Sequence, residues 1–254
     1  MTNVDDELLA AAETHDEATL RKLLDGGLDP TALVRGKTPV QWLLEMYLRS
    51  TRFPACLHLL LARGGVLPWP DLAAVLLDDG DALRGQLARD PGLLTRRFDL
   101  VSTFTPLAGA TALHVAAEYG NHRAAHVLLA AGADVEARAA TTTDGGDGHT
   151  PLFHTVCSIL DHGAPVMRAL LVAGARTDVR LPSLTWGRGF EWQTTLYDVT
   201  PISFCQFGLL PQFHRSEADI YRNLDALLTA GGRKGAPFAN LPNRYLQPRG
   251  SVRG

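Results

Sequence analysis

Apolar positions fall into short blocks along the chain, and glycine closes most of the blocks. The clearest block, Gly109–Ala137, reads GATALHVAAEYGNHRAAHVLLAAGADVEA. The small pair Ala116–Ala117 lets a first helix lie close to a neighbour, and Val127–Leu129 gives a second helix an apolar stripe. Gly120 and Gly132 suit the left-handed backbone that ends a helix. The pattern predicts two short helices joined by a tight turn.

The ends of these helices carry recognisable residues. Thr111 can accept a hydrogen bond from an orphan backbone N–H at the start of the first helix. Ala112 fills the first helical position, and Ala133–Val135 turns the chain away after the second helix. On these residues the stretch resembles one complete ankyrin repeat, a family that usually has proline at the position of Ala112. The resemblance implies a fold of stacked helix pairs with β-hairpin fingers between them.

The same register extends over most of the chain. Leu23–Pro30 (LLDGGLDP) closes a first repeat, and Thr38–Pro39, Thr150–Pro151 and Thr200–Pro201 each open a later one. The expected repeats are 5–35, 36–69, 70–100, 109–142, 148–181 and 198–232. The chain is therefore predicted to be an all-α ankyrin-repeat solenoid of five to six helix-turn-helix repeats over residues 1–232, with β-hairpin fingers, one of them extended. Residues 233–254 form a basic, proline-containing tail.

Two segments depart from the family pattern. Residues 71–94 hold two short helical patterns without the Thr-Pro or Gly-Ala-Asp signatures, so they are either a weak repeat or a helical insertion. In the fifth repeat the first helix is predicted to run on through HTVCSILDHG (residues 154–163), about three residues longer than in the fourth.

Composition narrows the functional class. The 254 residues are 46% hydrophobic, which suffices for a core, and the net charge of −3 argues against a general nucleic-acid binder. Residues 1–30 hold eight acids, and the last 24 residues hold five basic residues and no acid, which indicates a solvated cap and a solvated tail. The dominance of Arg over Lys, beside abundant Ala, Leu and Gly, suggests a GC-rich bacterial genome.

Cysteine usage and the N-terminus point to the cytoplasm. Cys56, Cys157 and Cys205 lie in apolar segments at no framework spacing, which predicts reduced thiols. The N-terminus is acidic and lacks the order of a signal peptide. No apolar run approaches the roughly 20 residues that span a bilayer, so no membrane association is expected.

The resemblance implies that the concave face and the fingers bind other proteins. Matching the variable positions of the family one by one selects Glu118 and Tyr119, which precede Gly120, and His149, which precedes the helix-start Thr150. These three side chains are predicted to contact a partner.

The most distinctive finger spans residues 184–197. Leu184–Trp186 and Phe190–Leu196 read as two strands around Gly187–Gly189. Aromatic residues and Arg dominate binding hot spots. The candidate binding residues in this finger are Trp186, Arg188, Phe190 and Trp192. Phe190 and Trp192 share one strand face, which also fits a finger that packs back on its own body, so binding and packing both stay open.

The nine histidines raise a metal or catalytic alternative. His114 takes the place of the histidine in the family's helix-start motif, where the ring bonds to loop backbone. No pair of ligands has zinc-finger spacing, and no phosphate-binding loop follows a strand, so no metal and no cofactor are expected. His154, Cys157 and His162 on the lengthened helix could share a face, which leaves an enzyme as the alternative.

The sequence therefore predicts a non-enzymatic protein–protein interaction module, monomeric and cytoplasmic, in a scaffold, inhibitor or immunity-type role. One or more proteins are the expected partners, with no nucleic acid. The enzyme with a His/Cys site in the fifth repeat, and a nucleic-acid binder that uses the basic tail, are the alternatives.

Overall fold

A computed structural model describes residues 3–102, 105–143, 145–187, 193–206 and 216–232. The described chain is mostly helical and carries two small antiparallel hairpins. The α-helices are α1 (Val4–Thr14), α2 (Glu17–Asp25), α3 (Pro39–Glu45), α4 (Phe53–Ala62), α5 (Ala73–Leu76), α6 (Gly80–Arg89), α7 (Ala112–Glu118), α8 (His122–Ala130), α9 (Ala164–Val172), α10 (Pro201–Cys205) and α11 (Glu217–Ala230). The short 3-10 helices are η1 (Pro70–Leu72), η2 (Pro91–Leu94), η3 (Pro151–His154) and η4 (Ile159–Asp161). The strands are β1 (Phe98–Leu100), β2 (Leu107–Ala110), β3 (Leu181–Trp186) and β4 (Thr194–Val199).

Threonine starts several of the helices, as predicted. Thr38 caps α3 in a reciprocal arrangement with Gln41, and Thr200 caps α10 through Ser203. Each cap satisfies backbone N–H groups that have no partner inside the helix. At α7 the hydroxyl of Thr111 lies 2.8 Å from Nδ1 of His114, which also accepts from the backbone N–H of Thr111.

The second helix of most pairs ends in the same way. A glycine with positive φ follows the helix, and the next residue donates its N–H to the carbonyl five positions earlier. The glycines are Gly27, Gly64, Gly132 and Gly174, with φ of 97°, 96°, 89° and 91°. The matching bonds run from Leu28 to Leu23, Gly65 to Leu60, Ala133 to Leu128 and Ala175 to Leu170, at 2.9–3.0 Å. Glycine is needed here because a side chain strains this backbone.

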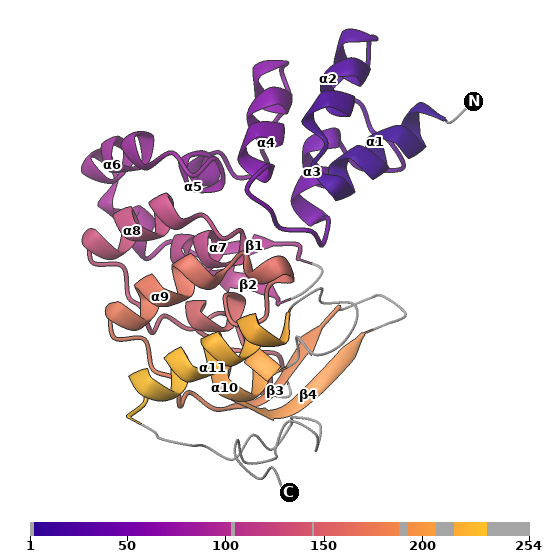
Figure 1. Cartoon of the computed structure of the whole chain (residues 1–254). Helices are drawn as coiled ribbons and strands as arrows, with labels where there is room; N and C mark the ends of the chain where they lie inside the picture. The colour runs from indigo at the N-terminus through magenta and orange to yellow at the C-terminus, as the bar shows by residue number, and fades with distance from the viewer. Residues whose placement is uncertain (1–2, 103–104, 144, 188–192, 207–215, 233–254) are drawn as a thin grey trace, which may run out of the picture.

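Helices pair in sequence order and then contact the next pair. α1 packs on α2, α3 on α4, α5 on α6, α7 on α8 and α10 on α11. Between pairs, α1 contacts α3, α6 contacts α8, and α8 contacts α9. The buried apolar residues of all these elements join in one core that runs from Leu8 to Leu228. In Figure 1, α6, α8, α9 and α11 line one side of the molecule, and both hairpins lie on the other.

The predicted long helix after Thr150 is wrong. The chain instead forms η3, a turn and η4, and Leu160 and Asp161 have positive φ (50° and 59°). The hydroxyl of Ser158 accepts the N–H of Gly163 at 2.8 Å, which fixes this turn. A side chain at Gly163 would meet the Thr155 carbonyl oxygen at 2.8 Å. The tight backbone approach therefore replaces the helix that the apolar spacing predicted.

The hairpins are joined into one hydrogen-bonded layer. The N–H of Ala140 donates to the carbonyl of Ala108 in β2 at 2.9 Å, and the N–H of Asp147 donates to Ser183 in β3 at 2.9 Å. The two arms between them also pair, through Ala139 and His149 at 2.9 Å. Chain segments from β1 to β4 therefore lie side by side, and the β3–β4 register runs without a bulge from Leu181–Val199 to Trp186–Thr194.

The predicted hairpin at 184–197 is present but longer at its base. β3 begins at Leu181 rather than Leu184, and β4 ends at Val199 rather than Leu196. The tip, 188–192, and the tail, 233–254, lie outside the described residues.

Candidate functional site

The turn that follows α7 collects contacts from four separate parts of the chain. It comprises Glu118–Asn121, and Gly120 at its centre has φ of 65°. Glu118, Tyr119 and Asn121 are all buried, with 6%, 0% and 3% of their surface exposed. We call this turn and the residues that bond to its side chains the central turn cluster.

Tyr119 ties the turn to the second helix pair. Its hydroxyl donates to the carbonyl oxygen of Leu44, at the end of α3, at 2.8 Å. The ring lies 4.7 Å from that of Phe53, and the guanidinium of Arg49 sits over it at 4.3 Å. Burial raises the pKa of the Tyr119 hydroxyl to about 12. The phenol is therefore a neutral donor at any physiological pH.

Glu118 is a buried carboxylate with three partners. Nδ1 of His154 lies 2.8 Å away, the hydroxyl of Ser102 donates at 3.1 Å, and Arg49 forms an ion pair at 3.4 Å. Burial alone would raise the pKa of Glu118, but the His154 hydrogen bond, the Arg49 charge and the Ser102 hydroxyl together lower it. Glu118 is thus ionised at neutral pH, and His154 must donate its Nδ1–H because a carboxylate only accepts.

The other two polar contacts of the turn join the neighbouring pairs. The amide of Asn121 donates to the carbonyls of Val75 and Leu76, at 2.8 and 3.1 Å. Nε2 of His162 lies 3.0 Å from the carbonyl oxygen of Tyr119. Burial lowers the pKa of His162, so its neutral ring carries the proton on Nε2 and donates. The turn therefore links the pairs α3–α4 and α5–α6 and the segment between η4 and α9.

Three histidine rings pack beside this turn. The ring of His149 lies 4.8 Å from His154 and 5.9 Å from His114, and His114 lies 5.7 Å from His154. The Nε2 of His114 bonds to the backbone carbonyl of His149 at 3.2 Å, which confirms the predicted bond to loop backbone. Burial, followed by the neighbouring rings, lowers the pKa of His114 to about 3 and that of His149 well below its usual value.

The ring of His149 is poorly satisfied. Within the described chain neither of its nitrogens has a hydrogen-bond partner. A neutral imidazole that has no partner for its N–H costs stability. The three rings are nonetheless too enclosed to act as an open ligand site, since all three residues are at most 4% exposed.

The segment that contains this turn matches a known family. Residues 108–140, which include most of β2 and all of α7 and α8, match the family model of the ankyrin repeat. The chain contains an ankyrin repeat. The comparison with curated proteins gives no match. Ankyrin repeats generally mediate protein–protein interactions and are typically not enzymes.

The turn Glu118–Asn121 lies inside this ankyrin repeat, and its partners from other parts of the chain change the predicted site. Glu118, Tyr119 and His149 were expected to lie exposed on the surface. This expectation is wrong, because at most 6% of each residue is exposed. The loop that carries Arg49 and the segment that carries His154 cover them. Direct contact of these side chains with a partner stays a prediction that the packing disfavours.

The finger residues next to the ankyrin repeat have a different outcome. Trp186 is the last residue of β3, while Arg188, Phe190 and Trp192 lie outside the described residues. At the base of the hairpin, Leu184 is fully buried and Tyr197 is 77% exposed. The base therefore packs on the body, and binding by the tip stays a prediction.

The His/Cys alternative loses its geometric basis. His154 lies on η3 and His162 beyond η4, so they do not share the face of one helix. The structure does supply the acid that a catalytic histidine needs, because Glu118 accepts from His154. Nε2 of His154, however, is buried and has no hydrogen-bond partner in the described chain, so Cys157 does not donate to it. The side chain of His154 is also 0% exposed.

Other chemistry can be stated for the described residues only. They hold no group of three or more His, Cys, Asp or Glu residues that could bind a metal ion. Cys56 and Cys205 are buried, and Cys157 is partly exposed. No helix among them is long and apolar enough to cross a membrane.

Sequence reasoning missed Arg49 and Ser102. Arg49 is 4% exposed and donates to the carbonyl of Met46, although it stands in a polar-looking segment, LRSTR. The signal in the sequence was the large pair Glu118–Tyr119, which directly follows the small pair Ala116–Ala117. A charged and an aromatic residue there need a partner of similar bulk, which Arg49 supplies.

Proposed function

We propose that the chain is an ankyrin-repeat solenoid of six helix pairs that binds a protein partner, without catalysis, through its fingers. The pairs are those of the ranges 5–35, 36–69, 70–100, 109–142, 148–181 and 198–232. In this account the matched repeat is the fourth, and the other five are divergent copies. A scaffold, inhibitor or immunity-type role fits such a module.

Two regularities support the repeat assignment. The glycine-ended second helices share one cap, as described above for Gly27, Gly64, Gly132 and Gly174. The turns inside the pairs also agree: His15, Asp78 and Gly120 have φ of 50°, 51° and 65°. Each of them directly precedes the N-cap residue of its second helix, and this residue is Asp or Asn. Recurrence of the same backbone conformation at such intervals is typical of a repeat protein.

The fingers are the proposed binding surface, because the turn Glu118–Asn121 is already packed against other parts of the chain. Glu118 and Tyr119 hold other parts of the same chain and cannot reach a partner without unpacking. The long hairpin leaves Tyr197 exposed and continues into a tip that is rich in aromatic residues. Aromatic side chains bury large areas at low entropic cost, which favours the finger as a binding element.

One observation carries the proposal most: the hairpin is fastened at its base. Asp147 donates its N–H to Ser183 at 2.9 Å, and its carboxylate accepts the N–H of Thr185 at 3.2 Å. Thr185 and Thr195 add a cross-strand hydroxyl contact at 2.9 Å. A finger fixed in this way loses little conformational freedom when it binds, which raises affinity.

The test is capture of proteins from lysate of the native host by the tagged full chain. The variant Trp186→Ala with Trp192→Ala should lose captured proteins while its melting temperature stays within a few degrees. Val172→Ser is the matched control, because Val172 is 90% exposed on α9, away from the hairpins. Equal capture by the finger variant, or loss in the Val172→Ser control as well, would count against the finger as the binding element. A fall of many degrees in the finger variant would show that the finger is a packed core.

A further inference from the structure

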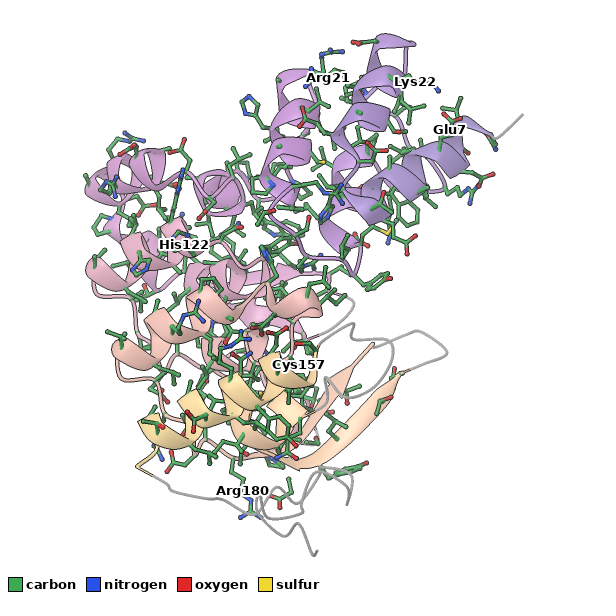
Figure 2. All side chains as sticks on the ribbon, in the orientation of Figure 1. Glu7, Arg21, Lys22, His122, Cys157 and Arg180 are labelled. Carbon is green, nitrogen blue, oxygen red and sulfur yellow. The ribbon has the colours of Figure 1, made fainter. Side chains whose placement is uncertain are left out.

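Helix α8 presents two histidines one turn apart. His122 and His126 stand at positions i and i+4, and both are exposed. Residues with this spacing lie on the same face of a helix. Their ring centroids are 5.4 Å apart. Neither imidazole has a hydrogen-bond partner within the described chain, so their nitrogens are available. Figure 2 marks His122 at the start of α8.

The pair opens on a groove between α6 and α8. The groove has a volume of about 1110 Å³ and is lined by both histidines together with Asp78, Asp79 and Asp81. The carboxylate of Asp78 lies near enough to His122 for the two to attract each other. Asp81 is 93% exposed and pairs with Arg84 at 2.5 Å, and Arg84 and Arg123 line the same groove. The lining therefore carries three carboxylates against the two guanidinium groups, so a cation that enters the groove meets a small excess of negative charge beside the two imidazoles.

We propose that His122 and His126 chelate one divalent transition-metal ion, of the zinc, nickel or copper class, in this groove. Imidazole nitrogen is a preferred ligand of these metals, and a His pair at i and i+4 is a recurrent metal-binding arrangement on helices. The proposed site lies between α6 and α8 and does not depend on the partner that the fingers bind.

The spacing of the rings fits one shared ion. With a zinc–nitrogen distance of about 2.0–2.1 Å and tetrahedral coordination, the centroids of two imidazoles on one ion lie about 5.2 Å apart. The observed 5.4 Å differs from this by a few tenths of an ångström, so the separation of the two rings is compatible with one shared ion.

The chain supplies only two strong ligands here, because no group of three exists in the described residues. The other coordination positions belong to water or to a group on another molecule. A site of this kind is open, in contrast to the closed four-ligand sites that hold structural zinc. It binds metal reversibly, and affinity falls when the imidazoles are protonated.

The experiment is calorimetric titration of the full chain with zinc chloride at pH 7.5. The wild type should bind one zinc ion that His122→Gln and His126→Gln each weaken by about tenfold or more, since a chelate becomes a single ligand. The matched control is His58→Gln on α4. His58 is also exposed on a second helix, but Pro54 and Ala62 occupy its i±4 positions.

Circular dichroism melting checks that each variant is folded; all three sites are exposed, so no variant should lose stability. Absence of zinc binding by the wild type would overturn the proposal. It would also be overturned by an affinity that the two α8 variants retain within threefold, or by an equal loss in His58→Gln.

Discussion

The hydroxyl of Tyr119 donates a hydrogen bond of 2.8 Å to the carbonyl oxygen of Leu44, which lies 75 residues earlier in the chain. The bond joins the turn after α7 directly to the end of α3 and bypasses the pair α5–α6. Arg49 reinforces the same junction, because it contacts both the ring of Tyr119 and the carboxylate of Glu118. The N-terminal pairs are therefore held by polar side chains as well as by the apolar core.

Tyr119→Phe should destabilise the fold. It removes one donor and leaves the Leu44 carbonyl buried without it, which costs about 1–2 kcal/mol. Urea unfolding measures this as a lower midpoint with an unchanged m-value. Tyr197→Phe is the control, because Tyr197 is 77% exposed and its hydroxyl can bond to water. Equal midpoints for wild type and Tyr119→Phe would show that the bond contributes nothing.

Glu118→Gln should have a larger effect. The substitution keeps the size of the side chain but leaves the charge of Arg49 buried without a counterion, at a cost of about 3 kcal/mol. Asp81→Asn breaks the exposed Asp81–Arg84 pair and should change the free energy of unfolding by less than about 1 kcal/mol. Similar losses in the two variants would contradict the account of Glu118 as a buried ionic centre.

Stability should fall in mild acid. Burial, followed by the charges of Arg49 and Arg52, lowers the pKa of His15 to about 3, and burial does the same for His114. Both histidines regain a pKa of 6.5 when the chain unfolds. The unfolded state then binds more protons, so the free energy of unfolding falls as pH drops from 6.5 towards 3. By pH 5 the loss is about 2 kcal/mol for each of the two.

Urea unfolding at pH 7 and pH 5 checks this expectation. His15→Asn should lose less stability between the two values than the wild type does. Asn tolerates the positive φ of 50° at this position. Tyr119→Phe keeps both histidines and should show the wild-type dependence on pH. An unfolding free energy that is the same at pH 7 and pH 5 would contradict the expected loss of stability in acid.

Asp147→Ala should loosen the base of the long hairpin. The substitution removes the acceptor for the N–H of Thr185 and leaves Ala at a φ of 57°, where it lacks the side-chain hydrogen bonds that allow Asp this backbone. Amide exchange in β3 should accelerate by about tenfold, measured by hydrogen–deuterium exchange. Asp147→Asn keeps an acceptor oxygen and tolerates this backbone, so it should exchange nearly like the wild type. Unchanged exchange in Asp147→Ala would mean that Asp147 does not hold the hairpin.

Local signals in the sequence predicted the helix pairs well. Thr before Pro and Gly after a leucine-rich helix act within a few residues, and these rules place α3, α4, α8 and α9 near their observed ends. The prediction of a long helix after Thr150 was wrong for the opposite reason. Its apolar spacing suits a helix, but the backbone there is fixed by Ser158 and by the close packing of Gly163.

The binding residues could be predicted less well, because burial is a tertiary property. Glu118 and Tyr119 occupy positions that are variable in the family, and variable positions suggest a surface. In this chain the loop with Arg49 folds over them, and a contact across about 70 residues leaves no periodic trace in the sequence. The histidines show the same limit: His149 precedes a helix start as expected, yet its ring is packed against His154.

The central claim is that the fingers bind the partner while the central turn cluster holds the fold. Its most direct test measures the dissociation constant of a captured partner for two variants side by side, with the melting temperature of each. Trp186→Ala with Trp192→Ala should weaken binding at least tenfold and leave the melting temperature nearly unchanged. Tyr119→Phe should lower the melting temperature and leave the dissociation constant unchanged. The reverse result, weaker binding by Tyr119→Phe with full affinity in the finger variant, would contradict the claim.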